Sequence, residues 1–356
     1  MKFGLNFFPS FRASDTTTAA YFDQCLRLSE RADALGYNSI KTVEHQFYDY
    51  GGHSPSPIVF LAAVAARTKR IRPITGAVIP AFNHPVKSAG ELAMLDNLSK
   101  GRLDAGFGRA FIPKEFEVFG VSMEESRPRF EECIEIITRL WTEDRVSYQG
   151  RFFKLDDVHL MPRPVQKPHP PIWIAAVASL DSFVWAGRRG YHLMVVPHGQ
   201  QLERTQQFVE AYRKAWRDSG FKPGAEQVQA ALMCYVAETH AEARRGFDTP
   251  AKRYIEVFSE AVSSWSTTQS AQYAGYDKLV AAISALTPQT MIDSHLAYVG
   301  TPEEVLEQVQ WHRDFFGEVE PSMQINFGGI RDTEAFRTLE LFARRVMPKF
   351  PAPATA

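Results

Sequence analysis

The chain alternates short runs rich in β-branched and aromatic residues with longer stretches in which apolar residues recur at helical spacing. Eight of the short runs are typical of strands, at 2–8, 37–44, 71–79, 103–108, 171–177, 191–196, 228–236 and 323–327. The stretch 19–35 illustrates the helical pattern, because Tyr21, Leu28 and Ala32 fall on one face. Strands that alternate with helices predict parallel pairing through right-handed crossovers.

Eight strand–helix units favour one α/β domain over residues 1–356, a closed (β/α)₈ TIM barrel, rather than an open doubly wound sheet. No linker or low-complexity block divides the sequence. Two segments are longer than a barrel needs, 142–170 before the fifth strand and 239–299 between the seventh and the eighth. Long connections at the catalytic end of a barrel commonly close over the site, so we expect 239–299 to form an active-site lid. The alternative is a helical insertion that only decorates the surface.

One predicted helix, at 56–66, is apolar on every side. A barrel helix normally has a polar outer face, so this one needs a cover from outside its own barrel. A homodimer interface is the simplest cover, and burial beneath the chain's own insertions is the alternative.

Composition limits the partners that this protein can have. The 356 residues are 45% hydrophobic, and 40 Lys and Arg residues face 41 Asp and Glu residues, so no basic surface for nucleic acid or an anionic membrane is expected. No apolar run approaches the roughly 18 residues of a membrane span. Three scattered cysteines suit neither a disulfide framework nor a Cys-rich zinc site, which favours a reducing cytoplasm. The ten histidines are dispersed, and we expect no metal site.

The working residues of a parallel barrel gather at the carboxyl ends of its strands. His45 follows the second strand, where it could exchange protons near neutral pH, although packing is the commoner use of a lone histidine. Gly108 and Arg109 end the fourth strand, and a guanidinium beside a closely approaching backbone suits a phosphate. Arg127, at a helix start, could converge on the same anion. A simple glycine turn with a surface arginine is the alternative.

Two further groups of residues follow predicted strands. Ser179 and Ser182 lie at the start of the helix after the fifth strand, where they could complete a phosphate site or only cap the helix. Several phenylalanines near strand ends, among them Phe8, Phe47 and Phe111, together predict an apolar, aromatic-walled pocket.

An ordered set of motifs extends through most of the chain. It comprises Met1-Lys2-Phe3-Gly4, Glu44-His45 before Phe47, His84-Pro85-Val86, the run 95–102, the run 106–109, Phe119-Gly120, Ser126-Arg127, the run 171–176 and the run 299–304. In their order and spacing these motifs resemble the bacterial luciferase-like flavin monooxygenases. The resemblance is weakest between 196 and 294.

The resemblance implies a TIM barrel that binds reduced FMN, uses O₂ to form a C4a-peroxyflavin, and oxygenates a small apolar or aromatic organic substrate, such as a biosynthetic intermediate. It assigns the flavin phosphate to Arg109 and Arg127, helped by groups near Ser179 and Ser182. It also places His45 beside the reactive edge of the flavin.

The same resemblance implies a non-prolyl cis peptide at Gly76-Ala77, against the isoalloxazine ring. It adds Glu44, Gly108 and Ala176 to the expected cofactor-binding residues. These assignments follow from matching positions only.

Because the sequence has no nicotinamide-binding fingerprint, a separate NAD(P)H:flavin reductase is the implied partner. Light emission is not expected, because Gln46 and Gly108 stand where light-emitting members carry a histidine and a reactive cysteine. Two other functions are open: an F420-dependent oxidoreductase of the same fold, and a non-catalytic flavin-binding protein.

Overall fold

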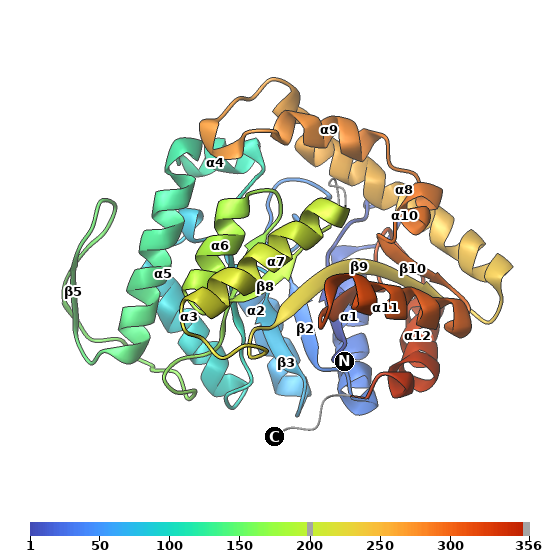
Figure 1. The fold of residues 1–356 in the computed structure, drawn as a ribbon, viewed down its shortest axis with the longest axis horizontal. Helices are drawn as coiled ribbons and strands as arrows, with labels where there is room; N and C mark the ends of the chain where they lie inside the picture. Colours follow the sequence, from blue (N-terminus) through green and yellow to red (C-terminus); the bar gives the residue numbers. More distant parts are fainter. Residues whose placement is uncertain (198–201, 352–356) are drawn as a thin grey trace.

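The computed structural model, which describes residues 1–197 and 202–351, has the predicted barrel fold (Figure 1). Parallel strands follow the order β3-β2-β1-β11-β9-β8-β7-β4, and parallel bridges from Ile74 to Asp104 and from Val78 to Phe107 join the two end strands into a ring. The strands of the ring are β1 (Gly4–Phe7), β2 (Ser39–Thr42), β3 (Arg72–Thr75), β4 (Ala105–Gly108), β7 (Ile172–Ala176), β8 (His192–Val195), β9 (Val228–Val236) and β11 (Glu320–Gln324).

Helices surround the ring and cover its carboxyl-terminal end. Thr17 begins α1 by accepting a hydrogen bond from Ala20 N, and Gly36 ends it with a φ of 88°. Within the described ranges, no helix combines the length and apolar character needed to cross a bilayer. The helices are α1 (Thr18–Leu35), α2 (Pro57–Arg67), α3 (Pro85–Leu98), α4 (Pro113–Phe119), α5 (Ser126–Thr142), α6 (Leu180–Arg188), α7 (Leu202–Asp218), α8 (His240–Val262), α9 (Tyr276–Ser284), α10 (Pro288–Asp293), α11 (Pro302–Phe316) and α12 (Asp332–Leu341).

The structure corrects the bounds of the last barrel strand, which runs over Glu320–Gln324 (β11) rather than 323–327. The early residues of this strand are polar or proline, a composition that hides a strand from a search for apolar runs. Glu320 is nevertheless buried inside the barrel, because Ser39 Oγ and Gln229 Nε2 donate hydrogen bonds to its carboxylate.

Both long segments contain regular structure that the sequence analysis did not predict. In 142–170, β5 (Val146–Gln149) and β6 (Lys154–Val158) form an antiparallel hairpin that projects beside α5 (Figure 1). The segment 239–299 holds α8, α9 and α10 and leads into β10 (Ala297–Gly300). This strand pairs with the second half of β9 without entering the ring.

The apolar helix predicted at 56–66 is α2, and its outer face is open. Phe60, Leu61 and Val64 are buried, whereas Val59 is 72% exposed. Burial beneath the insertions therefore does not account for this residue, and the homodimer interface stays a prediction.

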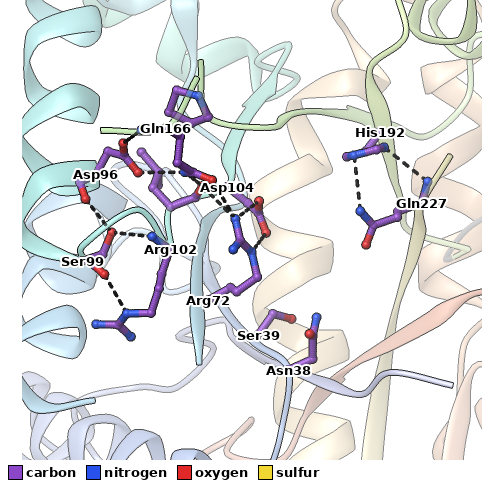
Figure 2. A network of polar contacts seen from close by, with 12 residues as sticks. Asn38, Ser39, Arg72, Asp96, Ser99, Arg102, Asp104, Gln166, His192 and Gln227 are labelled. Atoms are coloured by element: carbon purple, nitrogen blue, oxygen red, sulfur yellow. Dashed lines mark hydrogen bonds and ion pairs between the residues drawn. The ribbon is translucent and has the colours of Figure 1, made fainter. Parts of the chain in front are cut away.

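Two partly buried arginines at the amino-terminal end of the barrel are bound by neighbouring residues (Figure 2). Arg72 Nε and Nη2 donate to the two carboxylate oxygens of Asp104 at 2.9 and 2.7 Å. Arg102 donates to the backbone oxygens of Ser99 and Ile71, both at 2.7 Å. The cations at this end thus have acceptors supplied by the chain itself.

Candidate active site

A cavity lies at the carboxyl-terminal end of the barrel, the end that α8 and α9 cross in Figure 1. Strand ends, the loops that follow them and the segment 239–299 all contribute to its lining. Most of the predicted site residues line this one cavity: Phe8, Glu44, His45, Gly76, Ala77, Gly108, Arg109, Phe111, Ala176, Ser179 and Ser182.

Two arginines lie close to this cavity: Arg109 lines it, whereas Arg127 is not a lining residue and reaches it through Ser179 and Ser182, which do line it. Arg127 Nη2, at the start of α5, donates to Ser179 Oγ at 3.0 Å and to Ser182 Oγ at 3.3 Å. Burial, followed by the charge of Arg109, lowers the pKa of Arg127, so the two guanidinium groups lie within electrostatic reach of each other. The Arg127 Nη1 atom also lies 3.7 Å from Glu131 Oε1. Two cations and two hydroxyl groups together form a donor set that suits a phosphate.

Arg109 is held from the side of the long insertion. Its Nη2 donates to Gln272 O at 3.0 Å, and its guanidinium carbon lies 4.6 Å from the centre of the Tyr273 ring. Its Nε is buried and donates to no acceptor in the part of the chain that the structure describes. Leaving a buried donor without an acceptor costs free energy, which a bound anion would recover.

His45 is fixed in the cavity wall by a carboxylate. Its Nδ1 lies 3.2 Å from Glu115 Oε1, and the same oxygen accepts a hydrogen bond from Gln46 N at 2.9 Å. The His45 ring centre is 5.5 Å from that of Phe111 and 5.8 Å from that of Phe8. Glu115 was not predicted as a site residue; it lies 70 residues further along the chain, in the first turn of α4.

Glu44 lines the cavity, but its carboxylate binds the loop after β3. Ile79 N and Asn83 Nδ2 both donate to it at 2.9 Å. Burial raises the pKa of Glu44 to about 7, against the effect of these hydrogen bonds. Its contacts within the chain therefore position the backbone beside Gly76 and Ala77.

Residues with small side chains line one part of the cavity. The Gly76-Ala77 peptide is cis, as the resemblance implied. A Cβ on Gly108 would lie 3.1 Å from Ala77 Cβ and 3.4 Å from Ala175 Cβ, so these residues already pack closely. The ends of β3, β4 and β7 thus leave room for a planar ring to approach the backbone.

The aromatic wall differs in part from the predicted one. Phe8 and Phe111 line the cavity. Phe47 does not: it is 53% exposed, and its ring lies 6.2 Å from that of Phe119. Its φ of 68° is left-handed, a backbone conformation that an extended strand end does not have. This geometry does not support the predicted role of Phe47 in the pocket.

The long insertion supplies aromatic residues that the sequence analysis missed. Tyr50, after β2, stacks on Phe258 of α8 with ring centres 4.3 Å apart. Trp265 Nε1 donates to Phe111 O at 2.9 Å, which attaches the insertion to the loop after β4. Tyr254 and Phe258 are one helical turn apart, and this spacing was the feature of the sequence that could have predicted an aromatic face on α8. The aromatic lining residues from the insertion are Tyr254, Phe258, Tyr273 and Tyr276.

Known proteins resemble this chain over its whole length. Residues 1–316 match the sequence model of a family described as luciferase-like monooxygenase. The crystal structure of monooxygenase RslO1 from Streptomyces bottropensis is 41% identical and superimposes with a TM-score of 0.88, covering 99% of this chain and 100% of that chain. The oxygenase component of flavin-dependent trigonelline monooxygenase from Acinetobacter baylyi is 29% identical over 360 residues, 98% of this chain and 96% of the relative.

More distant structures share the fold alone. The oxygenating constituent of 3,6-diketocamphane monooxygenase from Pseudomonas putida, solved in complex with FMN, is 21% identical, with a TM-score of 0.82 over 99% of each chain. Solved F420-dependent enzymes are 17% identical, with TM-scores of 0.74 and 0.75.

Proposed function

The chain belongs to the luciferase-like monooxygenase family, and on this premise we propose that it is the oxygenase component of a two-component system that uses reduced FMN and O₂. The observation that carries the proposal is that Arg109, Ser179 and Ser182 line the cavity while Arg127 donates hydrogen bonds to both serines. A flavin phosphate is the anion that this donor set would hold.

The residues of the cavity fit a flavin. The buried Arg109 Nε has no acceptor among the described residues, and Gly76, Ala77, Gly108 and Ala176 present backbone rather than bulky side chains to a ring. Reduced FMN, when bound, supplies the two electrons with which one atom of O₂ enters a substrate while the other leaves as water.

His45 is the proposed proton donor of the reaction. Glu115 accepts from Nδ1, which leaves Nε2 as the atom that exchanges a proton in the cavity. The catalytic assignment therefore concerns His45, and Glu115 is a positioning residue.

We propose that the segment 239–299 acts as the lid that excludes water during oxygenation. The contacts of Trp265, Tyr273 and Gln272 with the loop 109–111 support this role, because they hold the insertion over the cavity. The aromatic walls favour a small apolar or aromatic substrate.

The implied partner is a separate NAD(P)H:flavin reductase that delivers the reduced flavin. A relative of this chain supports this arrangement, because the trigonelline monooxygenase protein from Acinetobacter baylyi is named as the oxygenase component of its enzyme. The test is oxygen uptake with such a reductase, FMN and a panel of small apolar and aromatic compounds under ¹⁸O₂. A labelled product that depends on reduced FMN supports the proposal. Unlabelled product that requires F420 would favour hydride transfer, and FMN binding without any product would favour a flavin-binding protein.

We also propose a cytoplasmic homodimer in which the exposed face of α2 contributes to the interface. Val59 and the adjoining alanines of this helix form the apolar surface that a second copy would cover, and the three cysteines are buried free thiols. Sedimentation of the protein and of Val59→Lys tests the interface. A dimer that the lysine dissociates is expected, and a monomeric parent protein contradicts it.

A further inference from the structure

One cation in the cavity lies apart from the proposed phosphate site. Lys41, on β2, lines the cavity and is only 3% exposed. Within the described residues it forms no hydrogen bond or ion pair, and Glu320 attracts it only at longer range. Burial lowers the pKa of Lys41 to about 8, so the ammonium is still mostly charged at neutral pH. A buried charge without a partner destabilises the folded chain unless a ligand compensates it.

Lys41 belongs to a polar layer that spans three adjacent strands. Asn6 on β1 pairs in register with Lys41, and Gln324 on the neighbouring β11 lines the same cavity. Asn6 Oδ1 and Gln324 Oε1 are buried, and neither accepts a hydrogen bond from a described residue. The layer therefore presents one ammonium group and two amide oxygens that lack partners among the residues that the structure describes. It lies deeper in the barrel than His45, which follows the end of β2.

The side chain of Lys41 runs along Gly76. A Cβ on Gly76 would come within 2.1 Å of Lys41 Cγ and 2.3 Å of Cδ, so a larger residue at 76 is incompatible with this path. The lysine thus emerges beside the Gly76-Ala77 peptide, the proposed platform for the flavin ring. The aromatic residues Phe111, Tyr50 and Phe258 line the same cavity, and we assign them to the substrate.

We infer that Lys41 binds the flavin ring itself and stabilises its reduced, anionic form, with Asn6 and Gln324 accepting hydrogen bonds from ring N–H groups. The inference rests on the proposed function. Reduced flavin loses a proton from N1 readily, and a positive charge near N1 is one of the ways in which proteins tune flavin chemistry. An acidic group on the substrate is the other class of ligand for a lysine, but the position of Lys41 beside Gly76 favours the ring.

The test compares the affinities of the two redox states of FMN. Lys41→Met keeps the length of the side chain without its charge, and Lys41→Gln is a second variant in case the first does not fold. Lys2→Met removes the same charge at the opposite end of the barrel, where Lys2 contacts Gln227, and is the control. Dissociation constants for oxidised FMN and for dithionite-reduced FMN are measured without oxygen, together with the midpoint potential of bound FMN.

We expect both Lys41 variants to bind reduced FMN about tenfold more weakly while their affinity for oxidised FMN changes little. A tenfold loss of affinity for reduced FMN alone lowers the midpoint potential of bound FMN by about 30 mV for a two-electron couple. The control should keep the parent potential. Equal weakening of both redox states, or an unchanged ratio, overturns the inference. If the parent protein bound neither form of FMN, the proposed function itself would fail, so the two failures are distinguishable.

Discussion

The cations at the two ends of the barrel differ in the partners that the chain gives them. At the amino-terminal end, Arg72 donates to both oxygens of Asp104, and Arg102 is bound by backbone oxygens (Figure 2). At the carboxyl-terminal end, Arg109 Nε and the Lys41 ammonium have no acceptor among the described residues. The same eight strands carry both sets, so the difference comes from the residues placed along them.

This contrast separates groups that stabilise the fold from groups that bind a ligand. A buried donor that is satisfied inside the chain contributes to stability, whereas one left without an acceptor destabilises the chain until a ligand binds. The parallel barrel directs binding to the carboxyl ends of its strands, which is the end where Arg109 Nε and Lys41 have no acceptor among the described residues. Mutations at the two ends should therefore affect different measurements.

The largest effect is expected from breaking the paired end. Arg72→Met leaves the buried Asp104 carboxylate without its partner and should lower the free energy of unfolding by about 3 kcal/mol, the lower end of the range for breaking a buried pair. Urea denaturation measures the loss. Arg145→Met, which removes the exposed Arg145–Asp157 pair on the hairpin, is the control and should change stability little. Equal losses in the two variants would remove the distinction between buried and exposed pairs.

At the other end, loss of His45 should affect turnover rather than folding. His45→Ala removes the proposed proton donor, and we expect the oxygenation rate to fall about 10²-fold, as for other general acids and bases, with FMN affinity nearly unchanged. Single-turnover product formation measures this rate. The exposed His159 of the 142–170 segment provides the control variant His159→Ala. Turnover that survives in His45→Ala would make this histidine a structural residue.

The next effect concerns the phosphate site. Arg127→Met should weaken FMN binding by about 2 kcal/mol, within the range for hydrogen bonds to charged groups, without lowering stability as Arg72→Met does. Quenching of FMN fluorescence gives the affinity. Arg129→Met, two residues along the same helix, controls for the change in charge. Unchanged FMN affinity in Arg127→Met would exclude this arginine from the site.

The smallest effect has the opposite sign. Lys41→Met removes a buried charge without a partner, and we expect it to raise the free energy of unfolding by at least about 1 kcal/mol at pH 7. Because burial lowers the folded-state pKa of Lys41 from 10.5 to about 8, the destabilisation is complete below pH 8. It should disappear as the pH rises toward 10.5, where the unfolded lysine also loses its proton. Denaturation of both proteins at pH 7 and pH 10 measures the difference between their free energies of unfolding. A parent protein that is more stable than Lys41→Met at pH 7 would contradict this prediction.

Much of the fold could be predicted because a parallel barrel repeats one pattern. All eight predicted strands overlap strands of the ring, because each contains or adjoins a short apolar segment between helices. β10 and the β5–β6 hairpin were missed because they lie inside the segments interpreted as insertions. β11 was shifted because Glu320 and Pro321 do not resemble a buried strand.

The candidate site was predictable where residues follow strand ends and was not where distant segments meet them. His45 and Arg109 follow their strands directly, so the barrel rule placed them correctly in the cavity. Glu115 and Tyr273 reach the site only through folding of α4 and of the long insertion. Phe47 follows a strand but adopts a left-handed backbone, which local apolar patterning does not reveal.

Above all, we propose that Arg109 and Arg127, at the carboxyl-terminal end of the barrel, bind a flavin phosphate. The most direct measurement is the ratio of the dissociation constants of riboflavin and FMN, two ligands that differ only in the phosphate, for the parent protein and for Arg109→Ala/Arg127→Met. The account predicts that the parent protein prefers FMN at least tenfold and that the double variant loses this preference while its affinity for riboflavin is unchanged. A preference for FMN that persists in the double variant would contradict it.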